Sequence, residues 1–171
     1  MASLIEELIT IVNKEVEQYE SLVTIASEKT KVIIENDLPK LQTITQKEQS
    51  IIDIVSSLEH KRMDIIHNIA TVLGRADKIL KIKDIIAMLD NQPKEQEHLS
   101  ILHDRFKASI QQLMDINNRN KSLITQSLEM IEFNMNFIQS TRMSPGNNNY
   151  SKGAKSIDAS FPQTRMFDTK Q

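Results

Sequence analysis

Residues that interrupt helices are almost missing from most of this chain. Among its 171 residues, residues 1–142 contain only Gly74, Pro39 and Pro93, whereas the last 29 residues contain two glycines and two prolines. β-Strands joined by tight turns need many more turn residues than that. We therefore predict an all-α fold: an antiparallel bundle of three long helices, one short connecting helix and a flexible C-terminal tail.

Composition narrows the class of protein. Hydrophobic residues make up 39% of the chain and aromatic residues only 4%, with no tryptophan, which suits helices with narrow apolar seams. Basic and acidic residues are interleaved and the net charge is −2, so nucleic-acid binding is not expected. The chain has no cysteine, which excludes disulfides and thiolate chemistry and favours a reducing compartment.

The amino-acid sequence shows no recognisable signal for targeting or for a membrane span. No stretch approaches the ~20 apolar residues of a membrane span. The first residues include Glu6 and Glu7 and lack a cationic leader before an apolar run. We expect no membrane insertion and a cytoplasmic location.

The first helix is predicted over residues 3–36. Ser3 and Glu6 have the spacing of a capping box, in which the serine would cap the helix. Apolar side chains then recur at alternating steps of four and three along one face: Ile5, Ile9, Val12, Val16, Tyr19, Val23, Ala26, Thr30 and Ile33. This heptad pattern predicts a long helix that packs against others.

The second helix is predicted to follow a turn at residues 36–39. Pro39 disfavours helical geometry at Leu38 and fits the first turn of a new helix, with Asp37 or Leu38 as its cap. The apolar pattern continues to about Leu73, and Gly74 is a candidate for a left-handed helix end.

Two charged residues occupy the apolar seam of the second helix, and they predict the register of the hairpin. Counting equal distances from the turn near residue 37 places Glu48 close to Lys29 and Arg62 close to Glu15. Such pairs would form polar layers that set the register. The alternative is that both side chains extend into solvent.

A short helix and a long one complete the prediction. Asp77 is a candidate cap for a short apolar helix over residues 79–89, and residues 90–93 form a turn that ends in proline. The last helix is predicted over residues 94–141. The tail, residues 143–171, is polar and predicted to be flexible, so the domains are expected at 1–142 and 143–171.

Small polar residues interrupt the seam of the last helix. These are Asn117, Asn120 and Ser127. They could hydrogen-bond the backbone of a partner, or they could form a polar layer inside the bundle. For the two asparagines we favour the polar layer, because buried asparagine commonly fixes register.

Helix lengths point to an exposed apolar end. At ~1.5 Å per residue, the last helix draws level with the hairpin turn at about residue 129 and continues for about three turns. That end is apolar nearly all round, with Met130, Ile131, Phe133, Met135, Phe137 and Ile138. Exposed apolar surface of this kind favours a partner-docking role. Alternatively, these residues cover the hairpin tip or pair with a second copy.

Catalytic and metal-binding patterns are not found. The four histidines lack the spacing of a metal site, since His98 and His103 are five residues apart rather than four. No glycine-rich phosphate loop or nucleophile–base arrangement can be assigned. We expect no enzymatic activity, no metal and no cofactor.

Motifs along the chain resemble the FlgN family of flagellar export chaperones. The most specific is Asn117-x-x-Asn120-x-x-Leu123-Ile124-x-x-Ser127-Leu128. Upstream, the arrangement Lys29, Asp37-Leu38-x-x-Leu41, Glu48 and Leu58-Glu59-x-x-Arg62 is similar to that family, and so is the tail segment Tyr150-Ser151-Lys152-Gly153. The resemblance extends over residues 20–153.

The resemblance implies a function. Such proteins bind hook-associated subunits of the flagellum through the subunits' terminal helices, prevent premature assembly and deliver them to an export gate component. By resemblance, the second half of the last helix binds the subunit, and Tyr150 is a candidate for gate contact. The partner-binding residues expected are Asn120, Leu123, Ile124, Ser127, Leu128, Met130, Ile131, Phe133, Met135, Phe137, Ile138 and Tyr150.

Two other functions are compatible with the same residues. One is a related chaperone for the filament cap. The other is a coiled-coil structural adaptor, a homo-oligomer that self-assembles through the apolar helix end. Partner identity would separate the first from the leading hypothesis, and self-association would separate the second.

Overall fold

A computed structural model describes residues 2–75 and 80–142 of the chain. In these ranges all the regular elements are helices: α1 (Ala2–Glu35), α2 (Leu38–Val72), α3 (Ile82–Met88) and α4 (Pro93–Arg142). The all-α prediction, with three long helices and one short connecting helix, is confirmed. The residues group into two compact units, Met1–Phe133 and Asn134–Gln171. The predicted domain division at residue 142 and the flexible tail stay predictions, because residues 143–171 lie outside the described ranges.

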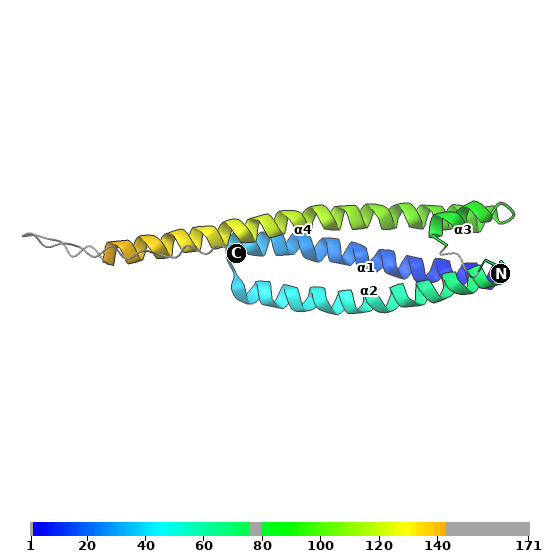
Figure 1. Cartoon of the computed structure of the whole chain (residues 1–171), viewed down its shortest axis with the longest axis horizontal. Helices are drawn as coiled ribbons and strands as arrows, with labels where there is room; N and C mark the ends of the chain where they lie inside the picture. The colour runs from blue at the N-terminus through cyan, green and yellow to red at the C-terminus, as the bar shows by residue number, and fades with distance from the viewer. Residues whose placement is uncertain (1, 76–79, 143–171) are drawn as a thin grey trace, which may run out of the picture. The chain divides into compact units, whose positions relative to one another are not determined.

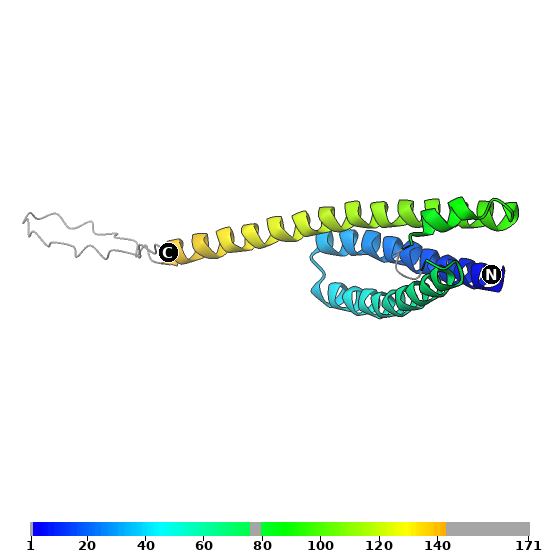
Figure 2. The ribbon, with the colours of Figure 1, turned by 45° about the vertical axis from the view of Figure 1, so that its right-hand side comes forward.

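In the first unit, α1 and α2 form an antiparallel hairpin, and α4 runs along α1 in the same direction as α1 (Figure 1). Figure 2 shows the same order after a turn of 45°, with α1 between α2 and α4. The short helix α3 lies at the end where α2 finishes and α4 begins. The short turn between α1 and α2 makes these two helices antiparallel, and the longer connection that contains α3 returns the chain so that α4 runs antiparallel to α2.

The turn between α1 and α2 consists of two consecutive residues. Asn36 adopts a left-handed conformation with φ of 56°, and its N–H donates to the carbonyl of Ile33. The N–H of Asp37 donates to the carbonyl of Val32, which completes a Schellman motif at the end of α1. The Asp37 carboxylate then accepts a hydrogen bond from the N–H of Lys40 at 3.0 Å, so Asp37 is the cap of α2, and Leu38, the other predicted candidate, is its first residue.

The end of α2 is a second Schellman motif, as predicted from Gly74. Gly74 has φ of 67°, a conformation that costs a residue with a side chain. The N–H of Gly74 donates to Thr71 and that of Arg75 donates to Ala70. The orphan carbonyls at the end of α2 are therefore satisfied locally.

Three details of the helix ends differ from the predictions or fall outside the described residues. Ser3 lies inside α1, which begins at Ala2, so it cannot have the non-helical backbone of a cap, and its predicted capping role was wrong. The helix α3 begins at Ile82, later than predicted, because the Asp84 carboxylate accepts from the N–H of the extended residue Lys81 at 2.9 Å. The predicted cap Asp77 lies outside the described residues.

The hydrophobic core gathers at the end of the first unit that contains α3. Every helix contributes buried side chains there, because the short α3 closes the space between the hairpin and α4. The cluster consists of Ile5, Leu8, Val12, Val16, Ile65, Ile66, Ile69, Ala70, Leu80, Ile82, Ile85, Leu89, Leu99 and Leu102. Burial of these aliphatic side chains supplies the main driving force for packing.

The register predicted for the hairpin is confirmed by two ion pairs. The ammonium of Lys29 lies 2.6 Å from Glu48, and both side chains are largely buried. The Nε of Arg62 lies 2.8 Å from Oε2 of Glu15 and donates a hydrogen bond to Oε1 at 3.1 Å. The alternative, in which Glu48 and Arg62 extend into solvent, is therefore wrong. Their long side chains bridge α1 and α2 instead.

Aromatic contacts join α4 to this layer. The rings of Tyr19 and Phe106 meet edge to face, with centroids 5.1 Å apart. The guanidinium of Arg62 lies 5.9 Å from the centroid of Phe106, on the face of the ring. Nearby, Arg105 donates two hydrogen bonds to one oxygen of Glu20 and a third to the other. These contacts hold the first half of α4 against the hairpin.

The two asparagines of α4 have different environments. Asn120 is 3% exposed; its amide nitrogen donates to the carbonyl of Ala26, and its oxygen accepts from the hydroxyl of Thr30 at 2.6 Å. The polar layer predicted for Asn120 is confirmed. Asn117 is exposed, and its predicted place in that layer was wrong. The buried seam of α4 passes through Ser109, one position before the expected Ile110, so Asn117 falls beside the seam.

Candidate partner-binding groove

An apolar groove lies where α4 passes the turn of the hairpin. The turn residues form one wall and α4 forms the other. The groove is lined by Val32, Ile33, Asn36, Asp37, Leu38, Leu41, Ile124, Ser127, Leu128 and Ile131. One residue of this turn is left-handed and the other caps α2. Together they reverse the chain, so that the start of α2 lies near α4. The sequence-based estimate that α4 reaches the turn at about residue 129 agrees with this geometry.

Apolar side chains remain exposed in and beside the groove. Leu128 and Ile131 on α4 are exposed, and so is Leu38 on the turn. Met130 and Phe133 lie on other faces of the same helix, and Phe133 is 69% exposed. Soluble proteins seldom leave such a group of large apolar side chains without a binding role.

The helical part of the second unit has the same character. Met135, Phe137 and Ile138 belong to α4 and are exposed. Methionine and phenylalanine are common at adaptable binding surfaces, because they offer large apolar area with few geometric demands.

The other predicted partner-binding residues have different environments in the structure. Ile124 and Ser127 line the groove, although the Ser127 hydroxyl donates to the Leu123 carbonyl of its own helix. Leu123 is half-buried. Asn120 is buried between α1 and α4, so it offers no free surface for a partner. Tyr150 lies outside the described residues.

Sequence reasoning missed the hairpin side of the groove. Leu38 and Leu41 of α2 and Val32 and Ile33 of α1 line it, but none was named as a candidate. The signal that could have found them is Leu38, a large apolar residue directly before Pro39 in a turn that should face water. Its exposure next to Ile131 is explained if both contact the same partner.

The electrostatics of the groove are mild. Asp37 is its charged lining residue, and the backbone N–H of Lys40 holds the pKa of that carboxyl below its ordinary value. The Lys40 ammonium lies 3.0 Å from the same carboxylate, which raises the pKa of the lysine. This charge is therefore already compensated by the turn, and the rest of the lining favours an apolar ligand.

A second groove adjoins the first and is polar. It is lined by residues of α1, α2 and α4, and it shares Ile124 with the apolar groove. The lining residues are Lys29, Glu48, Ile52, Asn117, Asn120, Lys121, Ile124 and Thr125. The lining includes the Lys29–Glu48 ion pair.

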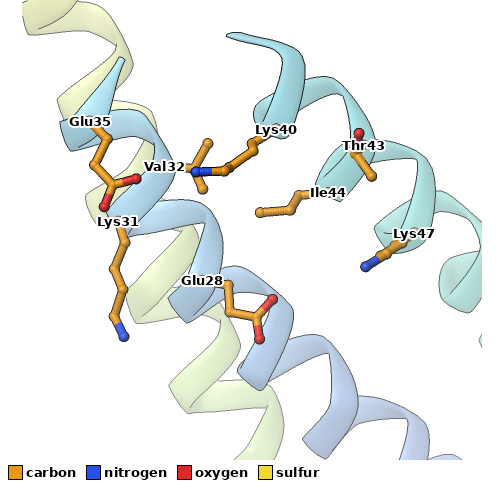
Figure 3. Close-up of a pocket in the computed structure, with 8 residues that line it drawn as sticks. All are labelled: Glu28, Lys31, Val32, Glu35, Lys40, Thr43, Ile44 and Lys47. Carbon is orange, nitrogen blue, oxygen red and sulfur yellow. The ribbon is translucent and has the colours of Figure 1, made fainter. Parts of the chain in front are cut away.

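A third depression lies between α1 and α2, and its lining contains no residue of α4. Figure 3 shows Val32 and Ile44 facing the space between the two helices, with charged side chains around them. The lining consists of Glu28, Lys31, Val32, Glu35, Lys40, Thr43, Ile44 and Lys47. Only Val32 and Ile44 are large and apolar, and both are mostly buried, so this depression offers less contact area for a partner helix.

Neither a metal-binding cluster nor a membrane-spanning helix is found in residues 2–75 and 80–142. No three histidine or carboxylate side chains in these ranges come together in a way that could hold a metal ion. Among the same helices, none combines the length and apolar character needed to cross a bilayer. Of the depressions described, the two that share Ile124 lie along α4.

These features define an all-helical protein with an open apolar groove beside the turn of its hairpin. Comparison with known proteins specifies the class further. The model of the FlgN family, described as FlgN protein, matches residues 1–156. The chain belongs to the FlgN family, which is the flagellar export chaperone family.

A relative among curated proteins is similar over most of its length. It is the uncharacterised protein YvyG of Bacillus subtilis strain 168, which is 26% identical over 155 residues and covers 89% of each chain. No solved structure matches the chain.

Proposed function

We propose that this protein is a cytoplasmic export chaperone for flagellar hook-associated subunits. It binds a terminal amphipathic helix of the subunit, prevents premature assembly and delivers the subunit to the export gate. The observation that carries the proposal is the apolar groove at the hairpin turn, whose lining residues Leu38, Leu128 and Ile131 remain exposed. Membership of the FlgN family supports the flagellar partner.

The binding mode follows from the shape and chemistry of the groove. An amphipathic helix lays its apolar face into a hydrophobic groove through residues spaced three and four apart. Leu128 and Ile131 have that spacing on α4, and Leu38 and Leu41 have it on α2. A partner helix between these two rows would complete a local four-helix arrangement. The exposed Met130 and Phe133 would extend the contact, and Met135, Phe137 and Ile138 stay predicted partner-binding residues.

Moderate affinity suits a protein that must release its partner. A terminal segment that is disordered before assembly folds as it binds, and its ordering costs about 2–5 kcal/mol of the interaction energy. Binding then protects the partner without trapping it. Tyr150 stays a predicted contact with the export gate.

Peptide titration tests the proposal. Peptides that cover the terminal helices of hook-associated subunits are titrated against the full chain by calorimetry, together with a filament-cap peptide. Micromolar or tighter binding of a hook-associated peptide is expected, and Ile131→Asp should weaken it at least tenfold. Ile101→Asp is the matched control, because Ile101 lies on the same helix, is 52% exposed against 50% for Ile131, and is outside the groove.

Each other outcome has a defined meaning. Selective binding of the filament-cap peptide would assign the protein to the related chaperone for the cap. A stable homo-oligomer by ultracentrifugation, dissociated by Ile131→Asp and indifferent to every peptide, would favour the structural adaptor and contradict the proposal.

A further inference from the structure

The polar groove continues the apolar groove along α2 and α4. The two share Ile124, and α4 residues from Asn117 to Ile131 line one or the other. The fourteen residue steps from Asn117 to Ile131 rise about 21 Å along the helix axis, at ~1.5 Å per step. A docked helix that follows the whole length would therefore need about four turns.

Positive charges outnumber negative charges among the residues that line the polar groove. Asn117 and Lys121 are four residues apart on α4, so they lie on one face of the helix. Lys29 and Lys121 bring two positive charges, whereas Glu48 brings one negative charge and is already paired with Lys29 at 2.6 Å. In the part of the chain that the structure describes, the Lys121 ammonium and the Asn117 amide make no hydrogen bond.

An apolar helix face cannot satisfy this end of the groove. If an entirely apolar face covered Lys121 and Asn117, both would lose water without gaining a partner, which is unfavourable. A carboxylate on the incoming helix would supply both the missing charge and hydrogen-bond acceptors. Arginine or lysine at the same position would repel Lys121.

We infer that the helix received by this protein has two parts: an apolar face for the groove at the hairpin turn, and an acidic residue that meets Lys121 beside the Lys29–Glu48 pair. The inference rests on the proposed function and deepens it by naming the chemistry of the partner. The charge contact also fixes the direction of the bound helix, because reversing the helix would place its carboxylate in the apolar groove.

Charge reversal tests the inference with the same hook-associated peptides and the full chain. Lys121→Glu should weaken peptide binding about fivefold to tenfold, since an attraction becomes a repulsion. Lys107→Glu is the matched control, because Lys107 is an exposed residue of α4 two heptads earlier and lies outside both grooves. Circular dichroism of each variant verifies that the bundle remains folded.

A rescue experiment identifies the acidic partner residue. Each aspartate or glutamate of the binding peptide is changed to lysine in turn. One such peptide should bind the wild-type protein weakly and recover its affinity with Lys121→Glu. Equal binding of wild-type peptide to wild type, Lys121→Glu and Lys107→Glu would overturn this inference while leaving the proposed function intact. Failure of every peptide to bind wild type would overturn both.

Discussion

The guanidinium of Arg62 lies 2.8 Å from the carboxylate of Glu15, although 47 positions of sequence separate the two residues. Glu15 is 1% exposed and belongs to the same layer as Tyr19 and Phe106. Oε2 of Glu15 is buried and lacks a well-aligned hydrogen bond. The pair therefore fixes the register of α1 against α2. The Glu15 carboxylate is buried, and its charge is compensated by Arg62.

Arg62→Leu should destabilise the protein by about 3–5 kcal/mol, because it leaves the Glu15 carboxylate buried without its counter-charge. Urea unfolding followed by circular dichroism measures the change. The double variant Glu15→Leu with Arg62→Leu should recover most of the loss, since no charge then remains buried. Arg105→Leu is the control: its pair with Glu20 is nearly half exposed on both sides, and its loss should cost less than about 1 kcal/mol. A loss for Arg62→Leu no larger than for Arg105→Leu would contradict the prediction.

Stability should depend on the pH through Glu15. Burial raises the pKa of the Glu15 carboxyl above its ordinary value of 4.5, although the Arg62 charge and hydrogen bond lower it in part. As the pH rises from 4.5 toward the raised pKa, the unfolded chain loses this proton before the folded chain does, so the free energy of unfolding falls. Unfolding curves across this interval should show the fall in the wild type and a smaller one in Glu15→Gln. The same slope in both would show that Glu15 is not its source.

Asn120→Ala should loosen α4 from α1. The amide bonds both the Ala26 carbonyl and the Thr30 hydroxyl, and its removal leaves buried groups without partners at a cost of about 1–3 kcal/mol. Hydrogen exchange should be faster in α4 around residue 120. Asn117→Ala, a change of the same kind at an exposed position three residues earlier, should alter stability by less than about 0.5 kcal/mol. Similar effects of the two variants would mean that Asn120 is not part of a polar layer in solution.

Gly74→Ala should lower stability by about 1–2 kcal/mol through backbone strain alone. Gly74 has a positive φ, and a Cβ added there would meet no atom within 4 Å, so no clash contributes. Thermal unfolding measures the loss. At Asn36, the other left-handed helix end, Asn36→Gly should be neutral or slightly stabilising because glycine tolerates that conformation better. An unchanged Gly74→Ala variant would indicate that α2 can end without the left-handed residue.

Much of the hairpin could be predicted from the sequence because its signals are local and strong. Pro39 and Asp37 mark the turn. Because the turn is short, residues at equal distances before and after it are expected to face each other. The predicted contacts of Glu48 with Lys29 and of Arg62 with Glu15 followed from that count and are confirmed.

The seam of α4 was harder to predict because steps of three and four compete along a helix. At residues 109 and 110 the apolar isoleucine seemed the better seam position, but the structure buries the serine. The Ser109 hydroxyl donates to the Arg105 carbonyl of its own helix, so the small residue is buried without an unsatisfied group. A shift of the buried seam by one residue turns the helix by about 100°. This shift places Asn117 at the polar groove rather than inside the bundle.

The sequence by itself determined that this chain is helical, where its hairpin turns and which charges pair across the hairpin, because capping, breaking and heptad spacing act over a few residues. It also showed that residues 130–138 of α4 are largely apolar. Only the tertiary structure decided which of those residues stay exposed and that the hairpin turn supplies the opposite wall of the groove. That wall exists because Val32 and Leu41 are brought beside Ile131 by packing between helices, and such packing depends on side chains from three separate segments.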